Sequence, residues 1–445
     1  MLWNKYYQLL APELVAFYKG QPSRRCSDSS RQLRYHQNAE PEPFRPWNME
    51  MTVTPQDALS SIEQNLDSGG TDAIAQDTAC RLLCTGECEL PSLLAAAQHV
   101  RARFHPAVVT YSRKVFLPLT NLCRDYCGYC TFRRDPGQPG AHTMTPDEVM
   151  EIVRAGERMG CTEALFSLGD KPELLFPEMR DTLRRLGYKS TLHYLEAMCD
   201  KVLRESSLLP HPNPGLMSAE WLERLARVAP SMGLMLETTS SRLLAGGAAH
   251  DNAPDKDPTR RLRVIEDAGL KKIPFTTGIL IGIGETLEER VDSLVAIREL
   301  HEKYGHVQEV IVQNFRAKHG TAMATWPEPG HRDLLRTLAV ARLLMPRMNI
   351  QAPPNLSDPH YDDLLDGGIN DWGGISPLTP DYINPEMPWP HLEELRRRTE
   401  AKGFELRRRL PVYPEFMEQA GAHSELLAMR LGGSADAQGY ARRVA

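Results

Sequence analysis

Short apolar runs alternate with longer amphipathic stretches between residues 115 and 371. An apolar run of about 4–8 residues predicts a buried strand, and the stretches between the runs predict helices. Strands that alternate with helices over about 250 residues favour a parallel α/β barrel, whose chemistry lies at the carboxyl ends of the strands. The predicted strands are 115–119, 163–168, 206–210, 233–237, 273–281, 307–313, 347–352 and a weaker one near 368–371.

Helical spacing dominates the region before the first predicted strand. Apolar residues between 54 and 103 recur every three or four positions, which predicts a helical segment ahead of the barrel. Within the barrel, the best marked helix start is Thr145-Pro146-Asp147-Glu148. Its threonine and glutamate form a capping box, and its proline suits the first helical position.

These patterns divide the chain into four segments. Residues 1–50 contain a polar, aperiodic stretch and are predicted to be poorly ordered. Because Met49 and Met51 precede the first predicted helix, we interpret the first 48 residues as an extension upstream of the natural start. The other predicted segments are a helical segment at 51–105, the barrel at 106–388 and a helical tail at 389–445, weakly ordered after Gly432.

Charge and composition exclude several classes of protein. The chain has 52 basic and 58 acidic side chains, a net charge of −6, so neither nucleic acid nor a membrane surface is expected as a partner. No apolar run approaches the ~20 residues that a bilayer requires, and the N-terminus shows no signal-peptide core. Nine cysteines, three of them clustered, fit a reducing cytoplasm better than a disulfide framework.

Two basic triplets, 396–398 and 407–409, lie in the predicted tail. Acidic neighbours such as Glu394 and Glu405 offset their charge. We therefore interpret both triplets as solvated helix faces rather than as an RNA-binding patch.

The strongest chemical signal is the cysteine triplet Cys123, Cys127 and Cys130, which follows the first predicted strand with the spacing C-x3-C-x2-C. Three thiolates this close repel one another unless a metal or a cluster neutralises them. A structural zinc site needs four ligands, and no fourth follows at the usual spacing. Three thiolates on a four-iron cluster leave one iron open to a substrate. The alternative is a loop with three reduced thiols.

A second group, Cys80, Cys84 and Cys88, has a four-residue spacing that would place the thiols on one helix face. The Thr85-Gly86 pair is expected to break that helix, and no fourth ligand is near. Ordinary thiols are therefore favoured over a second metal site.

With the aromatic Tyr129 before its last cysteine, the triplet resembles the signature C-x3-C-x-aromatic-C of the radical S-adenosylmethionine (SAM) superfamily. The resemblance implies a TIM-type (β/α) barrel, complete or nearly complete. It also implies a [4Fe-4S] cluster on Cys123, Cys127 and Cys130, with SAM as the second cofactor.

The same resemblance suggests residues that bind SAM at successive strand ends. Gly169 and Asp170 stand where the superfamily has a Gly-Gly-Glu-like turn, from which this chain departs in having Gly-Asp. The stretch 278–285 fits the superfamily pattern G-x-I-x-G-x-x-E, and it is not a dinucleotide fingerprint because Leu287 replaces the third glycine. The implied SAM contacts are Gly169 and Asp170 for the amino group, and Glu237 and Thr238 for the ribose. Those for the adenine are Tyr129, Leu280 and Gly282.

Five further stretches narrow the resemblance, over roughly residues 105–415, to the first-subunit family of FO synthases: 111–120, 211–218, 237–241, 313–318 and 368–377. Members of that family are lyases that close the third ring of 7,8-didemethyl-8-hydroxy-5-deazariboflavin (FO). Their substrate is 5-amino-5-(4-hydroxybenzyl)-6-(D-ribitylimino)-5,6-dihydrouracil, and a 5′-deoxyadenosyl radical starts the reaction, which releases ammonia. The implied partners are the second FO synthase subunit, which makes this adduct, and a low-potential electron donor.

Polar residues near the later strand ends are candidates for binding the uracil and the ribityl chain. The candidates are Asn314, Arg316, Lys318, Asn355 and Asn370, and Asp371 and His211 are candidates for proton transfer. Loop Asn and Asp residues also cap turns, which is the alternative for each of them.

Three other functions stay open at this point. One is a related radical SAM enzyme, either the partner FO synthase subunit or an aminofutalosine synthase-like protein. Another is an electron carrier, although ferredoxin-like carriers use four cysteines for each cluster. The third is a zinc-binding interaction module, which would be colourless and would not bind SAM.

Overall fold

The computed structural model describes residues 54–67, 73–357 and 359–442. The predictions for residues 1–50 lie outside this range. No helix within it is long and apolar enough to cross a membrane.

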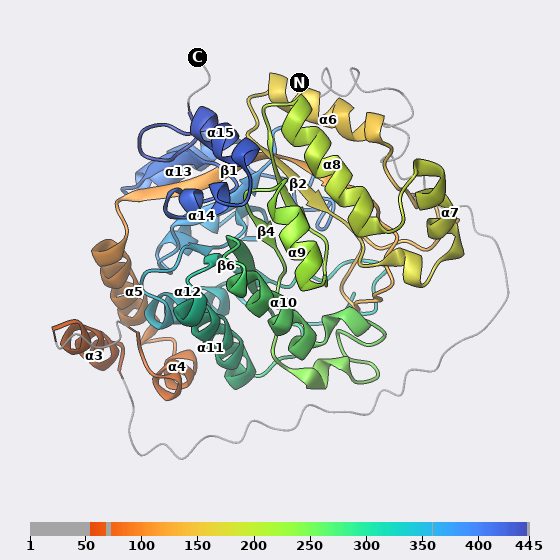
Figure 1. The fold of residues 1–445 in the computed structure, drawn as a ribbon. Coiled ribbons are helices and arrows are strands. Elements are labelled where there is room, and N and C mark those ends of the chain that lie inside the picture. Colours follow the sequence, from red (N-terminus) through yellow and green to blue (C-terminus); the bar gives the residue numbers. More distant parts are fainter. Residues whose placement is uncertain (1–53, 68–72, 358, 443–445) are drawn as a thin grey trace.

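Eight parallel strands form a nearly closed barrel, as the sequence predicts (Figure 1). Neighbouring strands follow the order β3-β2-β1-β8-β7-β6-β5-β4, and no hydrogen-bonded ladder among the described residues joins β3 to β4. Each predicted strand is present, although β4 and β7 are only two residues long. The strands are β1 (Val108–Pro118), β2 (Glu163–Ser167), β3 (Leu209–Asn213), β4 (Met232–Gly233), β5 (Phe275–Ile281), β6 (Val307–Asn314), β7 (Ile350–Gln351) and β8 (Asp371–Ile375).

Helices connect the strands on the outside of the barrel. The predicted capping box is confirmed: Glu148 N–H donates to the Thr145 hydroxyl at 3.3 Å, and Thr145 N–H donates to the Glu148 carboxylate at 2.6 Å. The connecting helices are α6 (Pro146–Arg158), α7 (Pro177–Leu186), α8 (Thr191–Glu205), α9 (Ala219–Ala226), α10 (Pro258–Leu270), α11 (Leu287–Tyr304) and α12 (His331–Leu344).

The helical segment predicted ahead of the barrel is also present, as an N-terminal helical extension made of α3 (Pro55–Asp67), α4 (Gln76–Leu83) and α5 (Leu90–Phe104). Helices α4 and α5 pack against α11 and α12, so the extension lies on the outside of the barrel (Figure 1). Buried Arg101 donates to the carbonyl oxygens of Ile369 and Val108, which fixes the end of α5 to the start of β1 and to the turn before β8.

The C-terminal segment is not wholly helical, which corrects the prediction for the tail. Besides α13 (Leu392–Ala401), α14 (Met417–Gly421) and α15 (Glu425–Ser434), it contains the strand β9 (Glu405–Arg409). This strand pairs in parallel with the first half of β1. The order expected to weaken after Gly432 also persists, since Ala435 pairs with Ala441.

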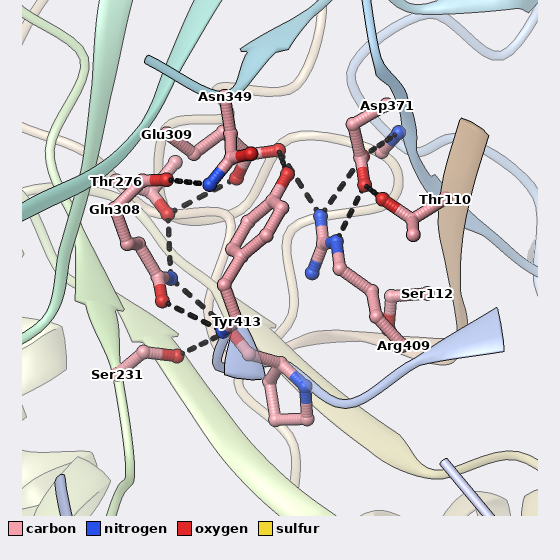
Figure 2. A network of polar contacts seen from close by, with 12 residues as sticks. Thr110, Ser112, Ser231, Thr276, Gln308, Glu309, Asn349, Asp371, Arg409 and Tyr413 are labelled. Carbon is pink, nitrogen blue, oxygen red and sulfur yellow. Dashed lines mark hydrogen bonds and ion pairs between the residues drawn. The ribbon is translucent and has the colours of Figure 1, made fainter. Parts of the chain in front are cut away.

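The basic triplet 407–409 belongs to β9 and not to a solvated helix, which corrects a second prediction. Arg409 is buried and points into the barrel, where it meets Asp371 and Glu309 (Figure 2). The chain then crosses the amino ends of the strands, and the Pro411 carbonyl accepts hydrogen bonds from Ser231 and Gln308. The C-terminal segment therefore covers the end of the barrel opposite the cysteine loop.

A small apolar core holds this cover in place. Leu410, Val412 and Phe416 of the C-terminal segment pack with Leu203 of α8 and Leu209 of β3. Burial of such side chains stabilises a fold by about 1.5–3 kcal/mol each. This core leaves the carboxyl end of the barrel for the chemistry.

Candidate active site

The cysteine loop leaves the carboxyl end of β1, where a parallel barrel carries its active site. Its first cysteine is held by the neighbouring strand end: the backbone N–H groups of Asp125 and Asp170 donate to Cys123 Sγ at 3.4 Å and 3.2 Å. Such N–H···S contacts are among the features that tune cluster potentials. The turn after β2 thus positions this sulfur.

Gly169 allows this contact between the turn and the loop. An added Cβ at this position would lie 1.9 Å from the carbonyl oxygen of Leu122 and 2.7 Å from Cys123 Cβ. The Gly169 N–H also donates to the Thr120 carbonyl at 2.9 Å. Only glycine fits where two backbones approach so closely.

The three thiols suit a cluster better than a single metal ion. The protein around them raises the pKa of Cys127 to about 12 and that of Cys123 further, mainly through desolvation, so bound cations are needed to hold the thiolates. A tetrahedral zinc ion would bring its sulfur ligands to about 3.8 Å from one another. Among the described residues, the three sulfurs form no group within 4.8 Å. The three sulfurs are therefore not gathered as closely as the ligands of one tetrahedral zinc ion would be.

Three buried carboxylates, those of Asp125, Asp170 and Asp255, lie behind the loop with oxygens within 4.8 Å of one another. Asp255 is paired with Arg124 at 2.7 Å and with Lys171 at 3.3 Å, and its N–H donates to Asp125 at 3.0 Å. Because cations and N–H groups balance these charges, we interpret the group as an anchor for the cysteine loop.

Asp170, a predicted SAM ligand, is part of this anchor. Its carboxylate accepts from the Leu216 N–H at 2.9 Å and from Lys171 at 2.5 Å. Burial raises its pKa to about 6. Gly215 approaches so closely that a Cβ there would lie 2.1 Å from the carboxylate. Asp170 therefore links the turn after β2 to the loop after β3, and its contact with SAM stays a prediction.

Glu237 has an unusual backbone at the carboxyl side of β4. Its φ is 67°, a left-handed conformation that costs a non-glycine residue about 1–3 kcal/mol and concentrates at functional sites. Lys256 Nζ lies 2.5 Å from its carboxylate. The adjacent Thr238 uses its hydroxyl to accept from the Ser240 N–H at 3.0 Å. This strained, paired carboxylate faces the side of the barrel mouth that carries Tyr129, since Lys256 is 5.9 Å from that ring.

An apolar surface lies beside Glu237 and contains two of the predicted adenine contacts. Tyr129 and Leu280 pack in one cluster with Phe315 and Met323, and the Tyr129 hydroxyl lies 3.1 Å from His250 Nε2. Gly282 follows with a φ of 87°. The structure therefore brings together Tyr129 and Leu280, which lie far apart in the sequence, next to the cysteine loop.

A cavity of about 170 Å³ lies inside the barrel, with polar residues from most of the strands in its wall. Of the residues predicted to handle substrate or protons, only His211 is among those that line it. Its polar lining consists of Lys114, Glu163, His211, Asn213, Thr276, Glu309, Gln313, Gln351, Asp381, Asn384 and Arg409.

His211 is held as a neutral ring. Its Nδ1 lies 2.7 Å from the Ser231 hydroxyl, which donates its own proton to the Pro411 carbonyl at 2.7 Å. Nδ1 is thereby assigned as the donor, which leaves Nε2 as a proton acceptor. Burial lowers the pKa of His211 to about 4, so the ring is uncharged at neutral pH.

The predicted substrate residues Lys318 and Asn355 hold a loop instead of lining the cavity. Lys318 donates to the Ile383 carbonyl at 2.8 Å, and Asn355 donates to Asp381 at 3.0 Å. Asp381 and Ile383 themselves line the cavity. Lys318 and Asn355 therefore do not line the cavity themselves but hold in place two residues that do.

Two more candidates from the sixth strand have protein partners. Asn314 donates to the Leu356 carbonyl at 3.1 Å, and its own carbonyl oxygen is buried without a partner. Arg316 is ion-paired with Glu328 at 3.1 Å.

Asn370 and Asp371 lie at the start of β8, at the end of the barrel opposite the cysteine loop. Asn370 bonds to Arg342 at 2.9 Å and to Asn349 at 2.7 Å. Asp371 receives two hydrogen bonds from Arg409, at 2.7 Å and 3.0 Å (Figure 2). The structure therefore does not bring these two residues to the cysteine loop.

Sequence reasoning missed several side chains at the site. Lys114 and Glu163 line the cavity, and Lys256 pairs with Glu237. The only signal for Lys114 was its position in the alternation of the strand. Every second residue of a strand faces the same side, so Lys114 shares its side of β1 with Thr110, Ser112 and Phe116. Lys256 ends a short 3-10 helix (Pro254–Lys256) between β4 and α10 and gave no signal.

Comparison with known proteins agrees with this geometry. Residues 117–297 match the model of the radical SAM superfamily. The chain is 50% identical over 337 residues to the 7,8-didemethyl-8-hydroxy-5-deazariboflavin synthase of Methanopyrus kandleri, a match that covers 75% of this chain and 100% of that protein.

Longer relatives match over part of their length. The FO synthase of Mycobacterium tuberculosis (strain CDC 1551 / Oshkosh) is 50% identical over 389 residues, which is 83% of this chain and 45% of that protein. The FO synthase of Streptomyces avermitilis is 51% identical over 362 residues, which is 78% of this chain and 42% of that protein. The chain thus spans about half the length of these relatives.

Solved structures share the fold. The [FeFe]-hydrogenase maturase HydG superposes with a TM-score of 0.65 at 19% identity, over 80% of this chain and 77% of HydG. Methylornithine synthase (PylB) gives 0.61 at 19% identity, over 78% of this chain and 97% of that protein. At these identities the likeness extends to the barrel alone.

Proposed function

Since the chain belongs to the radical SAM superfamily and, within it, to the family of 7,8-didemethyl-8-hydroxy-5-deazariboflavin synthases, we propose that it closes the third ring of this deazaflavin. The proposed substrate is the adduct 5-amino-5-(4-hydroxybenzyl)-6-(D-ribitylimino)-5,6-dihydrouracil, and the reaction is that of a lyase which releases ammonia. The observation that carries the proposal is the match over the full length of the M. kandleri protein, together with the C-x3-C-x2-C loop at the carboxyl end of β1.

Residues at the mouth of the barrel would hold the family's two cofactors. Cys123, Cys127 and Cys130 would ligate a [4Fe-4S] cluster, and Glu237 with the Tyr129–Leu280 surface would hold SAM. When bound, this pair supplies the electron that splits SAM and the 5′-deoxyadenosyl radical that takes a hydrogen atom from the substrate.

The protein's own contribution is to position the substrate and to accept protons. The cavity inside the barrel is closed below by Arg409 and the C-terminal segment, so its contents are shielded from water on that side. His211 is neutral, because burial lowers its pKa to about 4, and it lines the cavity, which places it to take up a proton while the ring closes. We do not assign a chemical role to Asp371, because Arg409 already occupies its carboxylate.

Two partners follow from the proposal. The adduct must come from an enzyme that joins a 4-hydroxybenzyl group to the ribitylated aminouracil, the activity of a second FO synthase subunit. An external low-potential protein must donate the electron. The relatives of about twice this length carry the name FO synthase for the whole chain, which supports a close link between the two activities.

The test is an anaerobic incubation of cluster-loaded protein with dithionite, SAM and the purified adduct. We expect deazaflavin fluorescence together with 5′-deoxyadenosine, and we expect the Cys127→Ala variant to lose both. Cys88→Ala is the matched control, because Cys88 is exposed and far from the loop in sequence. Formation of 5′-deoxyadenosine without deazaflavin would keep the superfamily assignment and refute the substrate.

A further inference from the structure

Lys114 is a buried cation that has aromatic rings near it but no hydrogen-bond acceptor or ion-pair partner among the described residues. Its side chain belongs to the inward-facing set on β1, the residue is only 7% exposed, and it lines the barrel cavity. Among the described residues, no group accepts a hydrogen bond from its ammonium, and no carboxylate lies within 4.0 Å of it. Burial lowers its pKa, and the nearby Glu163 carboxylate opposes that shift. A buried, unpaired ammonium is costly, so a site that keeps one has a ligand to offset the cost.

Glu163 stands directly beside Lys114 on the next strand. The two residues are register partners in the parallel pair of β1 and β2, and both line the cavity. Ser112 donates to one oxygen of the Glu163 carboxylate, and no described residue donates to the other. Opposite charges side by side would ordinarily form an ion pair. Here the Lys114 ammonium and one oxygen of the Glu163 carboxylate instead remain available for hydrogen bonds with a ligand in the cavity.

The surroundings of Lys114 form a fitted slot. Gly374 makes room for the lysine stem, because a Cβ there would lie 2.3 Å from Lys114 Cδ and 2.6 Å from its Nζ. The ammonium lies 5.5 Å from the centre of the Phe116 ring and 4.9 Å from that of Trp389. Both rings line the same cavity. A flat ligand ring would find aromatic walls next to one donor and one acceptor.

We propose that Lys114 and Glu163 together bind the imide edge of the substrate's pyrimidinedione ring, with Lys114 donating to a ring carbonyl and Glu163 accepting from the adjacent ring N–H. This inference rests on the proposed function, because that function supplies the pyrimidinedione. An ammonium only donates and a carboxylate only accepts, so the pair matches an edge on which an acceptor stands next to a donor. The hydroxyl groups of the ribityl chain both donate and accept hydrogen bonds, so they do not require a cation placed next to an anion.

The deazaflavin product carries the same imide edge and is fluorescent, so its binding can be measured without turnover. We expect Lys114→Met and Glu163→Gln each to weaken product binding about tenfold or more, the worth of one hydrogen bond to a charged group. The KM for the adduct should rise in the same proportion. Lys271→Met is the matched control, because Lys271 pairs with Glu223 on the surface.

A modified ligand separates recognition of the imide from a general effect of charge. A deazaflavin methylated on the imide nitrogen cannot donate to Glu163. It should bind the unaltered protein about tenfold more weakly than the parent ligand, and methylation should change its binding to Glu163→Gln much less.

Thermal unfolding checks that the variants are folded. Because Lys114→Met removes a buried charge that has no partner, we expect its melting temperature to be equal to or above that of the unaltered protein. A structural role for Lys114 would instead lower it.

The outcomes distinguish the two proposals. If the unaltered protein makes deazaflavin and both variants keep its KM and its product affinity, the imide assignment is wrong and the proposed function stands. If the unaltered protein neither makes nor binds deazaflavin, the proposed function fails, and the assignment fails with it.

Discussion

At Gly169 the turn after β2 lies against the cysteine loop, with no room for a side chain. A Cβ would approach the Leu122 carbonyl to 1.9 Å, so Gly169→Ala must push the loop away from the strand end. We expect the free energy of unfolding to fall by about 1–3 kcal/mol and the iron content after reconstitution to drop. Gly246→Ala is the control, because nothing lies within 4 Å of a Cβ there. Equal iron content in both variants would contradict this role.

Glu309 shares Arg409 with Asp371, so two buried carboxylates face one guanidinium. Burial raises the pKa of Glu309 from 4.5 to about 7, although Arg409 opposes the shift. Between these two values the folded chain holds a proton that the unfolded chain has released. Stability therefore falls as pH rises through this window, by at most about 1.4 kcal/mol for each pH unit.

Glu309→Gln removes this titration. Denaturant unfolding of the variant and of the unaltered protein, compared between about pH 4.5 and 7, should show a difference in stability that shifts in favour of the variant as pH rises. A difference that is constant across this range would show that Glu309 titrates normally in the folded protein.

Residue roles were the part of the site that sequence predicted least well. Tyr129 of the cysteine loop packs in one cluster with Leu280, as the superfamily spacing predicted. Lys318 and Asn355 also follow strand ends, but their donors bind the backbone and side chains of the loop at 381–387. That choice depends on which buried carbonyl groups lack a partner, and a single sequence does not contain this information.

At the scale of elements, the strand β9 lies in a segment that the sequence predicted to be helical. Its sequence, Glu-Leu-Arg-Arg-Arg, has a charged residue at a position that faces the barrel interior. A strand with an inward arginine is unrecognisable from hydrophobic alternation, because the carboxylates that neutralise Arg409 come from β6 and β8. The strands with apolar runs, by contrast, all overlap their predicted ranges, although β1 begins at Val108 and not at the predicted residue 115.

Arg409 also supports a prediction about the closed end of the barrel. Arg409→Leu leaves Asp371 and Glu309 buried without their cation, and we expect it to cost about 3–5 kcal/mol of stability. Denaturant unfolding measures this cost. The control is Arg397→Leu, which breaks an exposed pair with Glu394 and should cost less than about 1 kcal/mol. Similar costs for the two variants would mean that the network in Figure 2 does not hold the barrel closed.

At the scale of the whole molecule, the barrel has one end closed by the C-terminal segment and the other end occupied by the cysteine loop. The fold class was predictable, because alternating strands and helices permit few arrangements. The closure of the barrel at the amino ends of its strands was not predictable. It depends on contacts between segments more than a hundred residues apart, such as Pro411 with Ser231 and Gln308.

The chain spans the full length of the M. kandleri synthase and about half of the mycobacterial FO synthase. We therefore expect it to act on the preformed adduct and to make no deazaflavin from tyrosine and the ribitylated aminouracil alone. Adding the second FO synthase activity to that mixture should restore product. Deazaflavin made from the two precursors by this chain alone would contradict the division of labour.

The most direct test of the account measures deazaflavin, ammonia and 5′-deoxyadenosine in one anaerobic reaction with the purified adduct, SAM, a reductant and the cluster-loaded protein. Ring closure by this chain predicts that the three products accumulate in equal amounts, and that all three are absent with Cys127→Ala. A cluster-loaded protein that forms 5′-deoxyadenosine while the adduct remains unchanged would contradict the central claim.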